Sequence, residues 1–134
     1  MLIVFEYPVA AQTNDYLFRH LTTDNGLISN EVKALCQDSK GDIWIGTQTG
    51  LQRYDGNRFT TYLADIHNPE ALHTDWISTI FEDSKHRLWI GTAHGAPYLF
   101  NRKKGNFYNY NLYVNANHKK IIHKTIGTCK LISN

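Results

Sequence analysis

Short apolar stretches separated by turn-forming residues recur along this chain in two series. Each series predicts four strands, because runs of four to seven β-branched and aromatic residues bounded by Gly, Asn, Asp and Ser are typical of short strands. The first series covers residues 32–37, 42–47, 51–55 and 58–63. The second covers residues 76–82, 87–92, 96–101 and 106–110. We label the four strands of each series a to d in chain order.

The two series are copies of one repeat. Residues 27–50 match residues 72–95 at nine of 24 positions, with an offset of 45, where chance would give about one or two matches. Four strands per unit at this period indicate a blade of a β-propeller. The predicted fold is therefore all-β: two complete four-stranded antiparallel blades, partial strands at both ends, and an incomplete ring.

The shared motif has a structural explanation at each position. The acidic side chains can accept hydrogen bonds from turn amides. The turn glycine supplies a positive φ, which His86 must adopt in the second copy. The strand glycine allows close approach of another backbone. The tryptophans lie in strands that are apolar at consecutive positions, which predicts burial on both faces. These structural roles outweigh catalytic ones for Asp38, Gly41, Trp44, Gly46, Asp83, Trp89 and Gly91.

Composition excludes several classes of function. With 14 basic and 12 acidic residues the net charge is +2, too balanced for a nucleic-acid or anionic membrane surface. No apolar run approaches the roughly 20 residues of a membrane span. Cys36 and Cys129 are expected to be small buried hydrophobic residues, and the seven histidines lack metal-ligand spacing. We therefore expect no metal and no cofactor.

The ends of the chain extend the repeat. Residues 1–14 are either the remnant of an export signal, with small residues at 9–11 before Gln12, or an N-terminal arm. Residues 15–26 are expected to form strand d of a neighbouring blade and a linker. The blades themselves occupy 27–63 and 72–110. Residues 111–134 are expected to form a linker and, at 126–128, the first strand of a third blade.

The motif resembles a known family. Residues 38–47, Asp-Ser-Lys-Gly-Asp-Ile-Trp-Ile-Gly-Thr, followed by Gly50-Leu51 and 53–55, are similar to the two-component-regulator propeller repeat. That repeat builds the periplasmic sensors of hybrid two-component histidine kinases in Bacteroides-type bacteria. The resemblance implies a non-enzymatic, periplasmic sensor fragment whose ligand is an oligosaccharide. The further blades, immunoglobulin-like domain, membrane span and kinase modules of those sensors do not occur in the sequence.

A ligand is expected at one end of the blades. Successive antiparallel strands alternate in direction, so the connections before strand a and between strands b and c share one end, near the propeller axis. We call this end the mouth. Its polar and aromatic side chains could hydrogen-bond and stack on a sugar. The candidates are Asn25, Asn30, Gln48, His73, Asp75, Trp76 and His94. For each of them a plain solvated loop residue remains the alternative.

Two further alternatives remain open. The turn motif is also similar to the Asp-box of sialidase propellers, but the five arginines show no convergence and no catalytic motif appears. We therefore expect no enzyme. The chain could also be a structural or vestigial fragment that acts only through self-association or protein contact. A closed propeller needs at least four blades, about 180 residues. Either several copies of the chain therefore close a ring together, or the chain is a fragment of a longer protein; of the two, we expect association into a homo-oligomer.

Overall fold

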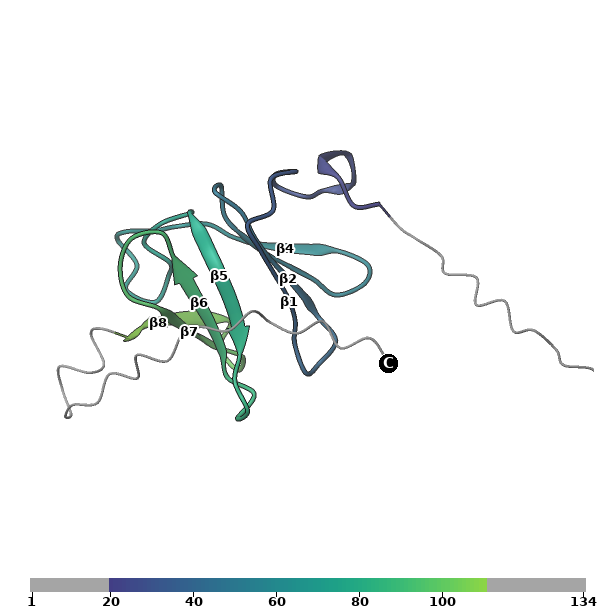
Figure 1. Cartoon of the computed structure of the whole chain (residues 1–134). Coiled ribbons are helices and arrows are strands. Elements are labelled where there is room, and N and C mark those ends of the chain that lie inside the picture. The colour runs from purple at the N-terminus through teal and green to yellow at the C-terminus, as the bar shows by residue number, and fades with distance from the viewer. Residues whose placement is uncertain (1–19, 111–134) are drawn as a thin grey trace, which may run out of the picture.

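Two four-stranded antiparallel sheets, packed side by side, make up the described part of the chain (Figure 1). The structure is a computed structural model, and it describes residues 20–110. Strands are consecutive in both sheets, in the orders β1-β2-β3-β4 and β5-β6-β7-β8. The prediction of two four-stranded antiparallel propeller blades is confirmed, and the sheets are not closed into a ring.

Blade 1 is the sheet formed by β1 to β4. Tight turns connect its strands, and the register pairs Cys36 with Trp44 and Trp44 with Arg53 across three neighbouring strands. These side chains therefore share one face of the sheet. The strands are β1 (Ala34–Gln37), β2 (Ile43–Gly46), β3 (Leu51–Tyr54) and β4 (Phe59–Tyr62).

Blade 2 repeats this arrangement. Phe81 pairs with Trp89, and Trp89 with Leu99, so Trp89 holds the place that Trp44 holds in blade 1. A register shift between Ile77 and Thr79 has no counterpart in blade 1. The strands are β5 (Ile77–Glu82), β6 (Leu88–Thr92), β7 (Tyr98–Asn101) and β8 (Asn106–Asn109). Most strands begin or end one or two residues inside the ranges expected from the sequence.

The main hydrophobic core lies between the two blades. Phe100 and Phe107 of blade 2 pack against Trp44 and Tyr62 of blade 1, with the Trp44 and Phe100 rings 4.8 Å apart and the Tyr62 and Phe107 rings 5.3 Å apart. Trp44 is fully buried. Aromatic pairs in such edge-to-face geometry contribute beyond the area they bury. A single four-stranded sheet has no interior of its own, so each blade buries its hydrophobic side chains against the other blade.

A second cluster lies on the far side of blade 1. Leu27 packs there with Ile45 and Tyr54. The segment that carries Leu27 begins with a short 3-10 turn, η1 (Thr23–Asn25), which the sequence analysis did not predict. His20 and Leu21, expected to belong to a strand, are not in a strand.

Several expectations fall outside the described residues. These concern the export signal at 1–14, most of the strand expected within 15–26, and the linker and third-blade strand within 111–134. Cys36 is fully buried, as expected. Its sulfur is disulfide-bonded, whereas the sequence analysis expected the two cysteines to be separate buried hydrophobic residues. Cys129 lies outside the described residues.

Candidate functional site

The turn between β1 and β2 is organised by one carboxylate. Asp38 Oδ1 accepts hydrogen bonds from the backbone N–H groups of Lys40 and Asp42 at 2.9 and 3.1 Å. Its Oδ2 accepts the indole N–H of Trp44 at 2.8 Å. The predicted role in closing the turn is confirmed, and the bond to the indole adds a link to the core that the sequence analysis missed.

Blade 2 repeats this geometry with Asp83. Its Oδ1 accepts from the backbone N–H groups of Lys85 and Arg87, and its Oδ2 accepts from the Trp89 indole at 3.0 Å. In both copies the tryptophan follows the aspartate by six residues. That repeated spacing is the signal in the sequence from which the indole bond could have been found.

The two copies differ in the cation that neutralises the carboxylate. Asp83 is bound by Arg87 of its own turn, with Nη2 2.6 Å from Oδ2. In blade 1 the position of Arg87 is occupied by Asp42, and the cation comes from blade 2 instead. Arg102, in the turn between β7 and β8, donates from Nη1 to Asp38 Oδ2 at 2.6 Å.

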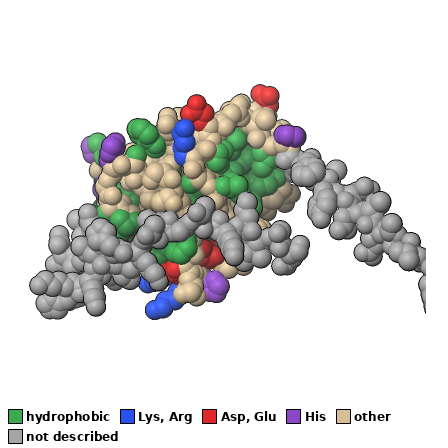
Figure 2. Space-filling view, in the orientation of Figure 1, with side chains coloured by type: hydrophobic (Ala, Val, Ile, Leu, Met, Phe, Trp, Pro, Cys, Tyr) green, Lys and Arg blue, Asp and Glu red, His purple; other side chains and the backbone are tan. Residues whose placement is uncertain are grey.

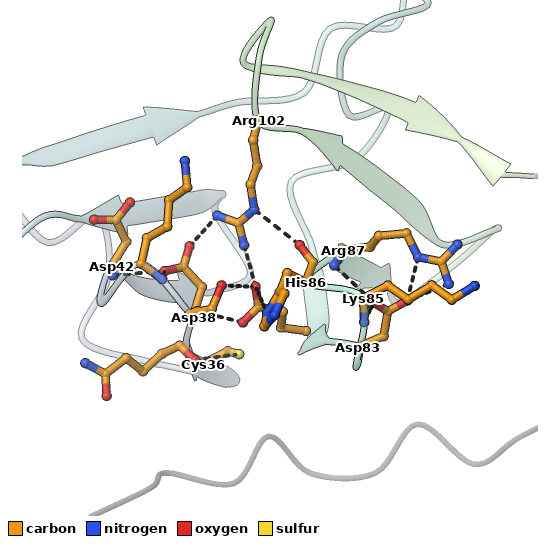
Figure 3. A network of polar contacts seen from close by, with 12 residues as sticks. Cys36, Asp38, Asp42, Asp83, Lys85, His86, Arg87 and Arg102 are labelled. Carbon is orange, nitrogen blue, oxygen red and sulfur yellow. Dashed lines mark hydrogen bonds and ion pairs between the residues drawn. The ribbon is translucent and has the colours of Figure 1, made fainter.

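Arg102 also ties the end of β5 to this network (Figure 3). Its Nη2 donates to Glu82 Oε1 at 2.8 Å. The same Glu82 carboxylate accepts the backbone N–H and the hydroxyl of Ser39 at 2.7 and 2.8 Å. Two side chains of blade 2 therefore hold the β1–β2 turn of blade 1, at the end opposite the mouth. No pattern along the sequence predicted this contact.

These contacts change the acidity of both aspartates. Burial opposes ionisation of Asp38, but hydrogen bonds from Arg102, Trp44 and the Lys40 N–H outweigh it and lower its pKa below the ordinary 3.8. Burial likewise opposes ionisation of Asp83, and the hydrogen bonds from Arg87 and Trp89 lower its pKa well below that value. Both carboxylates are therefore charged structural acceptors at neutral pH.

The motif glycines behave as expected. Gly41 has φ +88°, and His86, its replacement in blade 2, has φ +58°. A Cβ on Gly46 would lie 2.6 Å from Ile77 Cγ2, and a Cβ on Gly91 would lie 2.3 Å from Thr79 Cγ2. Gly46 thus permits the close contact of blade 1 with the first residue of β5.

Trp76, the residue before β5, lies at the mouth. Trp76 is 44% exposed, and its ring lies 6.0 Å from that of His94 at an interplanar angle of 81°. Its carbonyl accepts the N–H of Ala93, and the next residue, Ile77, donates its N–H to the carbonyl of Thr47 in blade 1. Two of the seven candidates are therefore brought together at the junction between the blades.

The other candidates hold loops in place. Asn25 Oδ1 accepts from the backbone N–H and hydroxyl of Thr22, while Asn30 Oδ1 accepts from the Thr23 N–H. Asp75 Oδ1 accepts the Ala64 N–H at 2.6 Å. These oxygens already have partners from the backbone.

His73 and Gln48 complete the set of candidates. The His73 backbone N–H donates to the Tyr98 hydroxyl at 3.2 Å, and the two rings are 6.1 Å apart. Gln48 is exposed in the β2–β3 connection. Among the seven candidates, Trp76 and His94 are the aromatic pair.

The sequence analysis expected that the arginines do not gather at one site, as they do in sialidase propellers. Each described arginine is paired with a nearby carboxylate. Arg53 lies 3.8 Å from Asp42, and Arg58 lies 3.4 Å from Asp55; Arg19 is outside the described residues. Between residues 20 and 110 no cluster of His, Cys, Asp and Glu could hold a metal ion. Nor does that part of the chain contain a helix long and apolar enough to cross a membrane.

Comparison with known proteins identifies the repeats. Residues 26–49 and 71–94 match the family model of the two-component regulator propeller, so both copies are repeats of that propeller type and the resemblance inferred from the motif is confirmed. The two matched segments are the two copies of the turn, strand and tryptophan motif described above.

Two particular proteins are similar to this chain. Histidine kinase P4 of Formosa agariphila is 37% identical over 60 residues, which are 45% of this chain and 4% of that protein. The extracellular domain of a hybrid two-component system from B. thetaiotaomicron has a crystal structure that superposes with a TM-score of 0.61. That match is 24% identical and covers 68% of this chain and 13% of the other. The chain thus spans a small part of both, and the structural match shows a shared fold.

Proposed function

We propose that this chain forms part of an extracytoplasmic, non-enzymatic sensor propeller of a two-component system, and that its ligand is an oligosaccharide. The match of both repeats to the regulator propeller supports the sensor class. Similarity to an extracellular domain and the small residues at 9–11 support export to the periplasm.

One observation carries the ligand proposal: the exposed Trp76 ring beside His94 at the junction between the blades. A large aromatic face left 44% exposed next to an imidazole suits the apolar face of a sugar ring, with polar groups close enough to fix its orientation. Trp76 also stands where the repeat diverges, since Glu31 occupies the equivalent position of blade 1. The blade packing that both copies share does not require a tryptophan at this position.

The test is a glycan array of oligosaccharides from depolymerised polysaccharides, followed by calorimetry on any sugar bound by the unaltered chain. Trp76→Ala is expected to weaken binding at least tenfold, and Trp76→Phe to retain most of it. Arg58→Ala is the matched control, because Arg58 is exposed in the β3–β4 turn at the opposite end. All variants should keep the same thermal unfolding midpoint.

Two outcomes would contradict the proposal. Equal affinity of Trp76→Ala and the unaltered chain would remove Trp76 from the site. Absence of any bound oligosaccharide, in a sample with the correct sheet content, would favour the alternative of a structural propeller fragment that acts through self-association or protein contact.

A further inference from the structure

The segment that leads into the first strand is built in the same way in both blades. These entry segments are residues 27–31, before β1, and residues 72–76, before β5, and they are equivalent parts of the repeat. Each starts with a buried leucine, Leu27 in blade 1 and Leu72 in blade 2. The leucine anchors the segment, because removing it from the core would expose its apolar surface to water.

The second residue of each entry segment is held through its backbone. In blade 1 the Ile28 N–H donates to Gln52 Oε1 at 2.8 Å. In blade 2 the His73 N–H donates to the Tyr98 hydroxyl at 3.2 Å. Gln52 and Tyr98 are equivalent residues of β3 and β7, so the third strand of each blade fixes the entry segment through a different side chain.

The third residue of each segment forms a small turn with the fifth. In blade 1 Ser29 Oγ accepts the Glu31 N–H at 3.1 Å. In blade 2 Thr74 Oγ1 accepts the Trp76 N–H at 3.3 Å. A hydroxyl that binds the N–H two residues later fixes the backbone of a turn, so both blades present their fifth residue on the same turn.

The fifth side chain is exposed in both blades. The fourth side chain, Asn30 or Asp75, accepts a backbone N–H of the preceding loop. By contrast, the Glu31 side chain is 72% exposed and Trp76 is 44% exposed. Trp76 keeps this exposure although its neighbour Ile77 is bonded to blade 1. Exposure at the fifth position is therefore a feature of the repeat and does not require an unoccupied neighbouring face.

The two fifth residues lie near the same end of β2. The carbonyl of Gly46 accepts the Lys33 N–H, and the next carbonyl along the chain accepts the Ile77 N–H, both at 2.8 Å. These two donors follow the fifth residues of their segments by two positions and by one. A single oligosaccharide at the mouth can therefore contact both side chains.

The Glu31 carboxylate is available to a ligand. Its Oε2 lies 3.5 Å from Lys33 Nζ, and the side chain makes no other polar contact in the part of the chain that the structure describes. Exposed ion pairs contribute little to stability, so sugar hydroxyls can replace the ammonium group. A carboxylate accepts hydrogen bonds and cannot donate them, so Glu31 suits hydroxyl groups and repels the carboxylate or sulfate of an anionic sugar.

The surrounding charge favours the same class of ligand. Among residues 20–110, the connections at the mouth carry five Asp and Glu residues against a single Lys or Arg, Lys33. Figure 2 shows acidic side chains projecting from the upper end of the view, where β5 begins in Figure 1. A surface of this sign repels anionic sugars and leaves neutral ones unaffected.

We propose that Glu31 is the ligand-selecting side chain of blade 1, as Trp76 is that of blade 2, and that the ligand bound by both is an uncharged oligosaccharide. The inference rests on the proposed function and adds the class of sugar to it. One sugar ring stacks on Trp76, and hydroxyl groups of the part that reaches blade 1 donate hydrogen bonds to Glu31.

The experiment compares two sets of oligosaccharides of equal chain length by calorimetry on the full chain. The neutral set comprises gluco-, manno-, xylo- and arabino-oligosaccharides, and the anionic set comprises oligogalacturonates and sulfated galacto-oligosaccharides. The unaltered chain is expected to bind a neutral oligosaccharide at least tenfold more tightly than any anionic one. Glu31→Lys should weaken binding of that neutral sugar about tenfold, because a hydrogen bond to a charged acceptor is lost, and should raise the affinity for anionic sugars.

A pair of variants separates the local charge at the mouth from the net charge of the chain. Glu31→Gln keeps the length of the side chain and removes its negative charge, so it should reduce the preference for neutral sugars. Asn57→Lys makes the same change in net charge at the opposite end, where Asn57 is exposed in the β3–β4 turn, and should leave that preference unchanged. All variants are expected to keep the thermal unfolding midpoint of the unaltered chain.

The outcomes distinguish this inference from the proposed function. Binding that is weakened by Trp76→Ala but unchanged in affinity and preference by both Glu31 variants would overturn the inference and leave the proposed function standing. Tighter binding of an anionic sugar than of any neutral one by the unaltered chain would do the same. Absence of binding to both sets would overturn the proposed function, and the inference with it.

Discussion

Arg102 of blade 2 donates to Asp38 of blade 1 across 2.6 Å, and this is the charged contact that fixes the end of the blade interface opposite the mouth. The Asp38 side chain is fully buried, so the carboxylate depends on this guanidinium, on the Trp44 indole and on the turn amides. Removing one member of such a set leaves a buried charge with fewer partners.

Arg102→Ala is therefore expected to lower the free energy of unfolding by about 2 kcal/mol. The measurement is urea unfolding followed by tryptophan fluorescence at pH 7. Arg58→Ala is the control, because the exposed pair Arg58–Asp55 is expected to contribute less than about 0.5 kcal/mol. Equal losses for the two variants would show that Asp38 does not depend on its contact with Arg102.

Stability should fall in acid because of Asp38 and Asp83. Both have pKa values lowered in the folded state, so their contribution is complete above the pKa of the unfolded chain, near 4, and is lost as the pH falls below it. Urea unfolding at pH 7 and pH 3 measures the loss.

The matched variant for this pH dependence is Asp38→Asn. It keeps the side-chain shape but removes the titrating group, so it should be less stable than the unaltered chain at pH 7 and should lose less stability between pH 7 and pH 3. A pH dependence identical to that of the unaltered chain would be evidence against the lowered pKa of Asp38.

Gly46→Ala should loosen the contact between the blades. The new Cβ would lie 2.6 Å from Ile77 Cγ2, and Ile77 is fully buried, so the strands must shift at a cost of about 1–3 kcal/mol. Thermal unfolding measures this loss. Gly91→Ala is an informative comparison, because its clash is with Thr79 of the same blade and should leave the interface between blades intact.

Limited proteolysis separates these two glycine variants. Gly46→Ala is expected to speed cleavage in the connection between the blades, residues 63–76, whereas Gly91→Ala is not. Equal cleavage rates in both variants would mean that Gly46 has no special role at the interface.

Repetition made the fold predictable. The period of 45, the turn residues and the consecutive apolar positions around Trp44 and Trp89 are local features, and local features determine strands, tight turns and the blade unit. The positive φ at Gly41 and His86 followed from the same reasoning. Burial of strand b on both faces was only half correct. Ile43 and Trp89 are half-buried, whereas Ile45, on the same face as Ile43, is buried because Leu27 packs on it.

The candidate site was less predictable. The shared end of the connections placed Trp76 and His94 near one another, which the structure shows. Whether a polar loop residue faces solvent or binds backbone depends on where neighbouring loops lie. Asp75, which binds the Ala64 N–H, is an example.

The sequence by itself determined the blade: its four strands, the turn closed by an aspartate, and the resemblance of the motif to the regulator propeller repeat. Only the tertiary structure decided how one blade recognises the next. Arg102 and Asp38 are 64 residues apart, and their contact depends on the packing of Phe100 and Phe107 on Trp44 and Tyr62. Strand formation follows from neighbouring residues, whereas pairing of charges across an interface follows from packing, which no local pattern along the chain encodes.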